Sequence, residues 1–256
     1  AEPVPAPGPK LSHDSIHLTD SAQLLGHAEA LGEAVESERP LTMEQLGQDF
    51  GFVLYETTLS QAGPALLEID QVRDRAQVFL DGQPVGVLER ENHEHALAFT
   101  VPQGGARLTL LVENQGRVNY GEGIHDRKGL PGQVLLDGAE LTGWTCRPLP
   151  LTSLAEVPFA PTTVTPTGPV LHRGTFELAI TADTFLHLDG WTKGNAWING
   201  FPLGRYWSRG PQRSLYVPAP VLRTGTNEIV VLELHAAHRA RTVSLRETPD
   251  LGPTEE

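Results

Sequence analysis

The sequence predicts an all-β protein built from two tandem β-sandwich domains. The 26 glycines and 21 prolines among 256 residues are many for a helical protein, and β-branched and aromatic residues occur in short runs between turns. An internal repeat of one hairpin and its flanks indicates that the same sandwich is present twice. With 39% hydrophobic residues, the chain can bury a core in each copy.

Residues 1–40 are predicted to form a Pro-rich linker followed by a helix. Residues 1–9 lack the basic and apolar regions of a signal peptide and are typical of an extended linker, which we expect to join a larger architecture. Asp20 and Ser21 can cap a helix that ends before Pro40. Its apolar residues recur at helical spacing: Leu24, Ala28, Leu31 and Val35.

Beyond this segment the hydrophobic pattern changes from helical to extended. Thr42-x-x-Gln45 is a capping box and predicts a short second helix. From Phe50 onward, apolar runs separated by turn residues predict strands. The clearest of these runs are Gly51-Phe52-Val53-Leu54-Tyr55, Ala76-Gln77-Val78-Phe79-Leu80 and Arg107-Leu108-Thr109-Leu110-Leu111-Val112.

The repeat consists of Asp81-Gly82-Gln83-Pro84-Val85-Gly86 and, 118 residues later, Asn199-Gly200-Phe201-Pro202-Leu203-Gly204. Each copy predicts a β-hairpin, because Asp-Gly and Asn-Gly favour two-residue turns with positive φ. The proline two places on suits an edge position that donates no ladder hydrogen bond. Apolar strands follow both hairpins at nearly equal separations, which indicates duplication of a whole domain.

The duplication predicts domains at residues 41–153 and 154–256, after the linker and helix of residues 1–40. We place the boundary in the turn-rich stretch 148–169, where several prolines interrupt any regular ladder. The many strands in each half, joined by long connections, suggest jelly-roll or galactose-binding-like sandwiches.

Composition and charge exclude several classes of partner. The formal net charge of −13 argues against nucleic acid and against an anionic membrane, because both require a basic face. Cys146 is the only cysteine, which excludes an internal disulfide and a zinc site built from cysteines. No apolar run approaches the roughly 18 residues of a membrane span. We expect a soluble chain without a cofactor, and the sequence leaves its compartment open.

Two ordered series of motifs are more specific than these patterns. The first comprises Tyr55-Glu56-Thr57-Thr58-Leu59, Arg73-Asp74-Arg75-Ala76, Leu111-Val112-Glu113-Asn114-Gln115-Gly116-Arg117-Val118-Asn119-Tyr120-Gly121 and Lys128-Gly129-Leu130. The second comprises Asp183-Thr184-Phe185-Leu186, Gly190-Trp191-Thr192-Lys193-Gly194, Trp197-Ile198-Asn199-Gly200-Phe201, Leu203-Gly204-Arg205-Tyr206-Trp207, Gly210-Pro211-Gln212 and Leu215-Tyr216-Val217-Pro218. Over residues 41–247 the chain resembles the two C-terminal β-domains, jelly-roll or galactose-binding-like, that follow the catalytic barrel in family 35 β-galactosidases.

The resemblance implies a complete enzyme that hydrolyses terminal β-D-galactosyl residues with retention, through two glutamates on barrel strands. The strand and helix alternation that builds such a barrel is absent from this sequence, and neither glutamate has a counterpart here. We therefore expect no catalytic residue and no hydrolysis by this chain alone. The expected partners are the catalytic barrel, in cis or as a separate chain, and β-galactosides.

Tyr120, with the adjacent Asn119, is the candidate substrate-binding position. The resemblance implies that the tyrosine of Arg117-Val118-Asn119-Tyr120-Gly121 approaches the sugar pocket from the first β-domain. Gly116 and Gly121 allow the loop to turn sharply. The alternative is a tyrosine that only packs against the barrel.

Five aromatic residues of the second half have two interpretations: Trp191, Trp197, Phe201, Tyr206 and Trp207. Aromatic faces stack on the apolar faces of pyranose rings, which suggests sugar binding. Burial in a core or a domain interface explains the same residues without a ligand, and we favour it.

Metal sites receive little support from the sequence. His93-x-His95 places two imidazoles on one face of a strand, but no third ligand follows at a suitable spacing. Asp183 and Asp189 could join a structural Ca²⁺ site, although carbonyl ligands are invisible in sequence. We expect no metal.

The leading hypothesis is a non-catalytic β-sandwich portion that braces the barrel of a family 35 β-galactosidase and lends a loop to its galactose pocket. The alternative is a free-standing galactoside-binding module without an enzymatic role. Calorimetry with galactose and lactose separates the two hypotheses. Linkage specificity and oligomeric state stay open.

Overall fold

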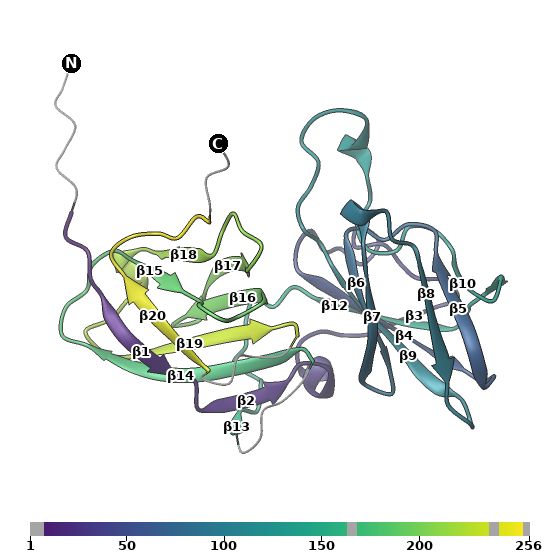
Figure 1. Cartoon of the computed structure of the whole chain (residues 1–256), viewed down its shortest axis with the longest axis horizontal. Coiled ribbons are helices and arrows are strands. Elements are labelled where there is room, and N and C mark those ends of the chain that lie inside the picture. The colour runs from purple at the N-terminus through teal and green to yellow at the C-terminus, as the bar shows by residue number, and fades with distance from the viewer. Residues whose placement is uncertain (1–7, 163–167, 236–240, 253–256) are drawn as a thin grey trace. The chain divides into compact units, whose positions relative to one another are not determined.

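The computed structural model describes residues 8–162, 168–235 and 241–252, and it confirms the all-β fold (Figure 1). Contacts divide the chain into two compact units, Ala28–Glu156 and a second unit made of Ala1–His27 and Val157–Glu256. We call them the first and the second sandwich. Each contains one six-stranded and one four-stranded sheet, and all the strand pairings found among the described residues are antiparallel.

The first sandwich packs its two sheets around one core. Its six-stranded sheet has the order β3 (Val35–Ser37), β12 (Trp144–Leu149), β4 (Phe52–Leu59), β9 (Ala106–Glu113), β6 (Arg75–Leu80) and β7 (Gln83–Glu89). Its four-stranded sheet has the order β11 (Ala139–Glu140), β10 (Val134–Leu136), β5 (Gly63–Ile69) and β8 (Ala96–Val101). Two 3-10 helices lie in its connections: η2 (Arg90–Asn92) and η3 (Glu122–His125).

Alternation along the strands builds this core. In β5, Leu67 is fully buried while the neighbouring Leu66 is exposed, as expected for a strand with one face on the core. Tyr55 of β4 and Trp144 of β12 are the largest fully buried side chains. The Tyr55 hydroxyl donates a hydrogen bond to the carbonyl of Leu41 (2.6 Å), so the buried polar group is satisfied.

The second sandwich has the same two-sheet composition. Its six-stranded sheet has the order β13 (Ala160–Pro161), β2 (Asp20–Gln23), β14 (Val170–Leu178), β19 (Gly225–Glu233), β16 (Lys193–Ile198) and β17 (Phe201–Trp207). Its four-stranded sheet has the order β1 (His13–His17), β20 (Thr242–Arg246), β15 (Thr184–His187) and β18 (Ser214–Val217). The 3-10 helix η4 (Ala219–Val221) follows β18.

Strand order indicates that the two sandwiches are copies of one fold. Strands β4, β9, β6 and β7 are neighbours in the first sheet in the same order as β14, β19, β16 and β17 in the second. The hairpins β6–β7 and β16–β17 shift register at corresponding places, between Val78 and Phe79 and between Ala196 and Trp197. The duplication expected from the sequence is therefore visible in the tertiary structure.

The two hairpin turns repeat each other in atomic detail. Asp81 and Asn199 both have positive φ, 46° and 51°. The Asp81 side chain accepts a hydrogen bond from the backbone N–H of Arg107 (2.9 Å), and the Asn199 side chain accepts one from the N–H of Glu228 (3.0 Å). Each turn is thereby tied to the inner neighbour of its hairpin in the sheet, β9 in the first sandwich and β19 in the second.

We expect Asp81→Ala and Asn199→Ala each to lower the free energy of unfolding of its own sandwich by about 1–2 kcal/mol. Each change removes the hydrogen bond from the following strand and places alanine in a left-handed conformation that Asp and Asn tolerate better. Asn199→Ala also removes the two bonds that the Asn199 amide donates to Val221 O and Asn227 Oδ1 (2.8 Å each), so its loss should be the larger of the two. Urea unfolding measures the loss. The matched control is Gln83→Ala, an exposed residue of the first hairpin, and equal losses for Gln83 and Asp81 would contradict the explanation.

The prediction of a helix within residues 1–40 is wrong. Residues 13–17 and 20–23 form β1 and β2, which pair with β20 and β14 and complete both sheets of the second sandwich (Figure 1). Only the 3-10 helix η1 (Leu25–Ala30) lies where the longer helix was expected, and His27 interrupts it with non-helical angles. Pairing with strands far along the chain outweighs the helical spacing of a few apolar residues.

The second predicted helix is also absent, although its capping box forms. The N–H of Thr42 donates to the Gln45 side chain (2.9 Å), and the N–H of Gln45 donates to the Thr42 hydroxyl (3.3 Å). The chain makes a single turn here instead of a helix. None of the helices in the described residues has the length and apolar character needed to cross a membrane.

Candidate functional site

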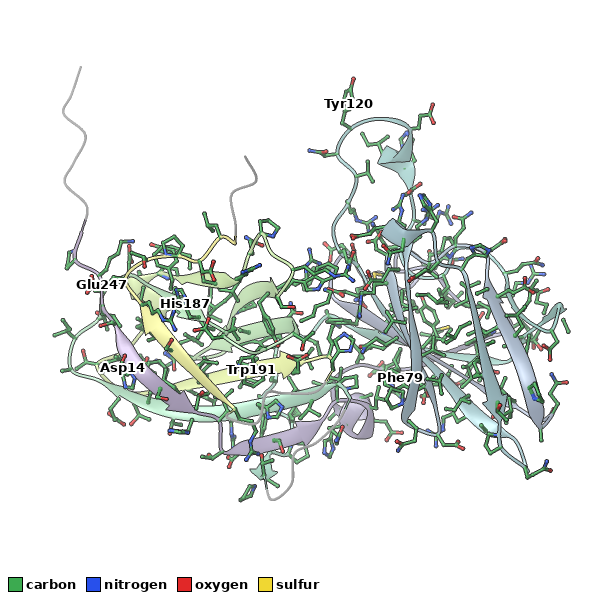
Figure 2. The ribbon with its side chains drawn as sticks, in the orientation of Figure 1. Asp14, Phe79, Tyr120, His187, Trp191 and Glu247 are labelled. Carbon is green, nitrogen blue, oxygen red and sulfur yellow. The ribbon has the colours of Figure 1, made fainter. Side chains whose placement is uncertain are left out.

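The candidate site is a long connection of the first sandwich, residues 114–127, which we call the Tyr120 loop. It leaves the end of β9 after Glu113 and returns at Lys128. Tyr120 lies at its outer end with the ring pointing away from the strands (Figure 2). The Tyr120 side chain is 90% exposed, and Asn119 beside it is also exposed.

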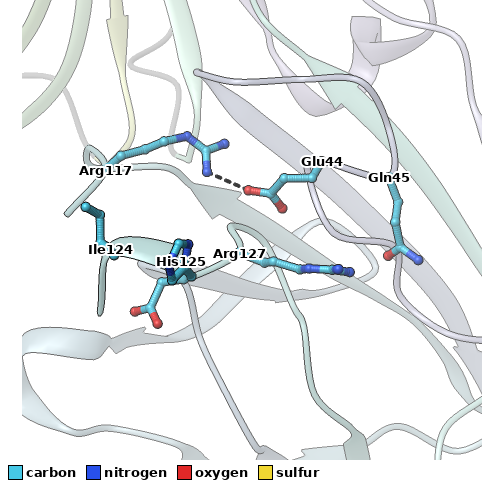
Figure 3. Close-up of a pocket in the computed structure, with 7 residues that line it drawn as sticks. Glu44, Gln45, Arg117, Ile124, His125 and Arg127 are labelled. Atoms are coloured by element: carbon cyan, nitrogen blue, oxygen red, sulfur yellow. Dashed lines mark hydrogen bonds and ion pairs between the residues drawn. The ribbon is translucent and has the colours of Figure 1, made fainter. Parts of the chain in front are cut away.

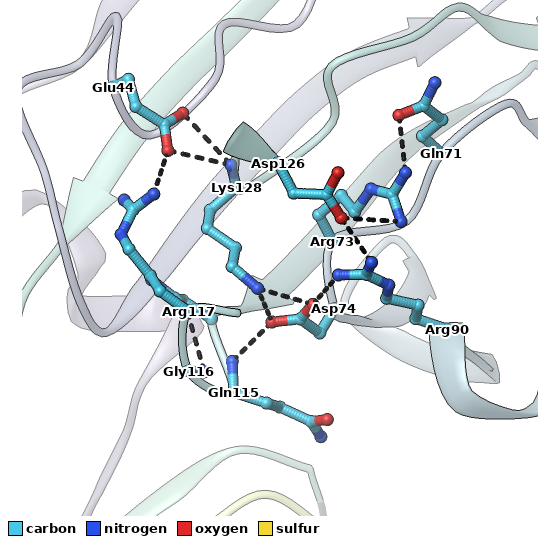
Figure 4. Close-up of polar contacts among 11 residues, drawn as sticks. Glu44, Gln71, Arg73, Asp74, Arg90, Gln115, Gly116, Arg117, Asp126 and Lys128 are labelled. Atoms are coloured by element: carbon cyan, nitrogen blue, oxygen red, sulfur yellow. Dashed lines mark hydrogen bonds and ion pairs between the residues drawn. The ribbon is translucent and has the colours of Figure 1, made fainter. Parts of the chain in front are cut away.

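The base of the loop is held by Asp74, which directly precedes β6. Its carboxylate accepts two hydrogen bonds from Lys128 Nζ (2.8 and 2.7 Å) and one from the backbone N–H of Gln115 (2.9 Å) (Figure 4). Gln115 begins the loop and Lys128 follows its end, so one carboxylate ties both ends together. Arg90 donates to Asp74 (3.1 Å) and to Asp126, which adds a second tie at the returning end.

Glu44 provides a further anchor from a distant part of the sequence. Both carboxylate oxygens accept from the backbone N–H of Lys128 (3.1 Å each), and one accepts from Arg117 Nη1 (2.6 Å). Partial burial would raise the pKa of Glu44, but the hydrogen bonds from Arg117 and from backbone N–H groups hold this pKa below its usual value. Glu44 is therefore ionised at neutral pH and fixes Arg117 inside the loop.

Burial makes the Asp74–Lys128 pair an essential part of this base. The side chain of Lys128 is 1% exposed and that of Asp74 is 8% exposed. Each charge has lost most of its hydration, and the other charge, together with the hydrogen bonds from Gln115 and Arg90 to Asp74, compensates for that loss. The outer end of the loop, with Tyr120, is thus mounted on an ordered base.

An open cavity of about 460 Å³ lies beside this base (Figure 3). It is lined by Glu44, Gln45, Arg117, Ile124, His125, Asp126 and Arg127. Glycoside hydrolysis needs one carboxyl with a raised pKa that donates a proton. The pKa of Glu44 is shifted in the opposite direction, and Asp126 is paired with Arg90, so these two carboxylates are bound to cations and are unsuited to that role.

Sequence reasoning identified Tyr120 and Asn119 but missed the residues that hold them. Asp74 and Lys128 stood in the motifs Arg73-Asp74-Arg75-Ala76 and Lys128-Gly129-Leu130, without an assigned role. One sequence signal could have indicated their role, because a charged residue at the end of an apolar strand needs a partner when it is buried. The partners are separated by 54 positions in sequence, which local patterns cannot connect.

The structure divides the aromatic residues of the second sandwich. Trp191, Trp197 and Tyr206 are 3%, 3% and 1% exposed, which favours the interpretation of burial over that of sugar binding for these three. Trp191, in the loop before β16, and Tyr206 of β17 belong to the core of the second sandwich, and Trp197 is buried in β16. Trp207 is only half-buried, and Phe201 is 48% exposed at the hairpin turn.

The residues considered for metal binding have other partners. His93 and His95 are exposed, and a ring nitrogen of His95 lies 3.0 Å from the carbonyl of His93. Asp183 accepts from the Tyr216 hydroxyl (2.7 Å) and from the N–H of Ala219 (2.8 Å). Asp189 is bound to Arg246. In the described ranges no group of three His, Cys, Asp or Glu side chains is arranged to hold a metal.

Comparison with known protein families decides the classification. Residues 40–150 match the model described as "Beta-galactosidase, first all-beta domain", and residues 169–227 match "Beta-galactosidase, galactose-binding domain". This chain carries two β-domains of the β-galactosidase family. The Tyr120 loop lies within the first matched segment, and the hairpin β16–β17 lies within the second.

Similarity to longer proteins named as β-galactosidases or as β-galactosidase-like extends over most of the chain. The chain is 38% identical to human Beta-galactosidase-1-like protein 2, over 98% of this chain and 41% of that protein. It is 39% identical to the β-galactosidase of Xanthomonas manihotis, over 87% of this chain and 37% of that protein. It is also 39% identical to human β-galactosidase, over 92% of this chain and 39% of that protein. The chain thus spans about two fifths of the length of these relatives.

Proposed function

We propose that this chain is the non-catalytic β-sandwich portion of a family 35 β-galactosidase, whose complete form hydrolyses terminal β-D-galactosyl residues. The two ordered motif series, the two matched domain families and the greater length of the relatives support this proposal. In this role the sandwiches brace a catalytic barrel, which is joined in cis or made as a separate chain, and linkage specificity resides with the barrel.

The exposed Tyr120 is the observation that carries the proposal. Tyr120 is 90% exposed on a loop whose base is fixed by a buried ion pair, so its side chain is free to meet another surface. Ile124 of the same loop is 52% exposed and adds apolar area. We propose that the barrel covers Ile124 while Tyr120, with Asn119, reaches the galactose pocket and hydrogen-bonds a sugar hydroxyl.

Replacement of Tyr120 by Phe in the complete enzyme tests the loop's role. We expect kcat/KM for an aryl β-galactoside to fall about tenfold, because one hydrogen bond to the bound sugar is lost while the ring stays. Tyr216→Phe is the matched control: this tyrosine is 49% exposed in the second sandwich and binds Asp183. Equal activity of the Tyr120 and Tyr216 variants would contradict the role of the loop.

The bracing role makes a separate prediction for the isolated chain. Highly purified chain should not hydrolyse aryl β-galactosides, since two carboxyls placed about 5–5.5 Å apart across the bond are needed for retaining hydrolysis. A separately produced barrel should bind the chain and gain stability from it. Hydrolysis that copurifies with the chain and withstands removal of host enzyme would contradict the non-catalytic assignment.

A further inference from the structure

The hairpin turn of the second sandwich contains a chemically reactive pair, Asn199-Gly200. Asn199 is the only asparagine of the sequence that a glycine follows. Glycine leaves its own backbone nitrogen unhindered, because it has no side chain, so this nitrogen can approach the side-chain carbonyl of the preceding residue. The five other asparagines precede larger residues: Asn92, Asn114, Asn119, Asn195 and Asn227.

The reaction open to this pair is deamidation. The Gly200 nitrogen attacks Cγ of Asn199 and forms a cyclic imide, while the amide nitrogen of Asn199 leaves as ammonia and takes up the proton of the Gly200 N–H. Water then opens the imide at either of its carbonyl groups. The product is aspartate or isoaspartate, in which the backbone runs through the side-chain carbon, and water is the only co-reactant.

In the folded chain, hydrogen bonds fix both ends of the Asn199 amide. Its Nδ2 donates to the carbonyl of Val221 and to Oδ1 of Asn227 (2.8 Å each). Its Oδ1 accepts from the N–H of Glu228 (3.0 Å). Attack makes Cγ tetrahedral and moves the nitrogen and the oxygen out of the amide plane, so these bonds must first break. The folded second sandwich therefore protects Asn199.

The neighbouring Asn227 makes an amide donor necessary at position 199. Asn227 is fully buried, and its Nδ2 donates to the carbonyls of Arg223 (2.7 Å) and Gly225 (3.0 Å). Backbone carbonyls only accept, so the Asn227 amide has one orientation and its Oδ1 faces Asn199. An aspartate at position 199 would set a carboxylate oxygen against this Oδ1 and against the Val221 carbonyl, and both acceptors would lose their donor.

The first sandwich has the acid at the corresponding position of its own turn. Asp81 has a φ of 46°, close to the 51° of Asn199, and likewise accepts from a backbone N–H, that of Arg107. An ionised carboxylate has no proton to donate, so this copy of the turn functions without a donor. The need for an amide is specific to the second sandwich, where Val221 and Asn227 supply acceptors.

We propose that Asn199 is a deamidation site that is controlled by the folding of the second sandwich. The amide is stable while the hairpin is folded, and it converts to the acid once the sandwich opens. The converted chain cannot restore the bonds to Val221 and Asn227, so prolonged unfolding of this sandwich becomes irreversible. The inference concerns one sandwich and does not depend on the proposed enzyme.

Incubation of the purified full chain at mildly alkaline pH, in buffer and in unfolding urea, tests the proposal. Peptide mapping by mass spectrometry follows the change from amide to acid at every asparagine. Asn199 should convert at least about tenfold faster in urea than in buffer, because the folded turn must first open. In urea it should also convert before the five other asparagines. Equal rates for Asn199 in buffer and urea would overturn the proposal, as would earlier conversion of another asparagine in urea.

Asn199→Asp carries one product of the reaction and tests its consequence. The midpoint of thermal unfolding of the second sandwich should fall by about 5–10 °C, through the lost donors and the facing acceptors. Tryptophan fluorescence reports this transition, since three of the four tryptophans belong to that sandwich. Asn119→Asp, the same change at an exposed position of the first sandwich, is the matched control and should leave the midpoint unchanged.

Refolding of the unchanged chain after increasing times in urea gives the same information if Asn199→Asp does not fold. The yield of chain with the original melting midpoint should fall in step with the fraction converted at Asn199. An Asn199→Asp chain that melts like the control, or a fully converted chain that regains the original midpoint, would show that the amide is dispensable and would overturn the proposal.

Discussion

Asp74→Ala should destabilise the first sandwich by about 3–5 kcal/mol, which makes it the most damaging single change expected at the Tyr120 loop. The substitution leaves Lys128 buried at 1% exposure with no carboxylate on its ammonium group, and an uncompensated buried charge costs about this much. It also removes the carboxylate that accepts from the Gln115 N–H, so both ends of the loop lose a hydrogen bond to Asp74. Urea unfolding reports the stability, and hydrogen exchange at Gln115 reports the release of the loop.

Two comparisons separate this effect from a general loss of charge. Glu56→Ala removes an ion pair with Arg107 on the surface of the same sandwich, where the Arg107 side chain is 67% exposed, and should cost at most about 1 kcal/mol. The double variant Asp74→Asn with Lys128→Met removes both buried charges and should recover part of the loss. A loss for Asp74→Ala no larger than that for Glu56→Ala would show that the buried pair contributes little.

Acidification should destabilise the second sandwich through His172 by up to about 3 kcal/mol. This side chain is fully buried in β14, and burial, followed by the nearby charge of Arg241, lowers its pKa from 6.5 to about 4. The unfolded chain takes up a proton near pH 6.5 that the folded chain does not accept until about pH 4. This contribution to stability is fully present above pH 6.5, falls as the pH is lowered through the window from 6.5 to about 4, and levels off below it.

His172→Phe isolates this contribution. The phenyl ring keeps the edge contact with Trp191, whose ring centroid lies 5.2 Å from that of the imidazole, but it cannot take up a proton. The free energy of unfolding, measured in urea at several pH values, should therefore fall less steeply between pH 6.5 and 4 in the variant. His17→Gln changes an exposed histidine of the same sandwich and should leave the slope as in the unchanged chain. Identical slopes for all three chains would exclude His172 as the cause.

Features that depend on neighbouring residues could be predicted from the sequence. Asp81-Gly82 and Asn199-Gly200 specify tight turns by their own tolerance of positive φ, and both turns form as expected. Strand alternation and the all-β class follow from the same short-range patterns. The resemblance of its motif implied that Tyr120 approaches a sugar pocket, which stays a prediction; the structure places this residue at the outer end of a loop, 90% exposed.

What only the tertiary structure decided involves residues far apart in the chain. Residues 13–17 and 20–23 form strands because they pair with β20 and β14, which lie far along the chain and which local sequence patterns cannot indicate. Trp191 is buried in the core, and Asp74 holds the base of the Tyr120 loop, because the fold brings their contact partners from distant positions in the chain. Turn and strand preferences act over a few residues, whereas burial and ion pairing depend on which segments the folded chain places together.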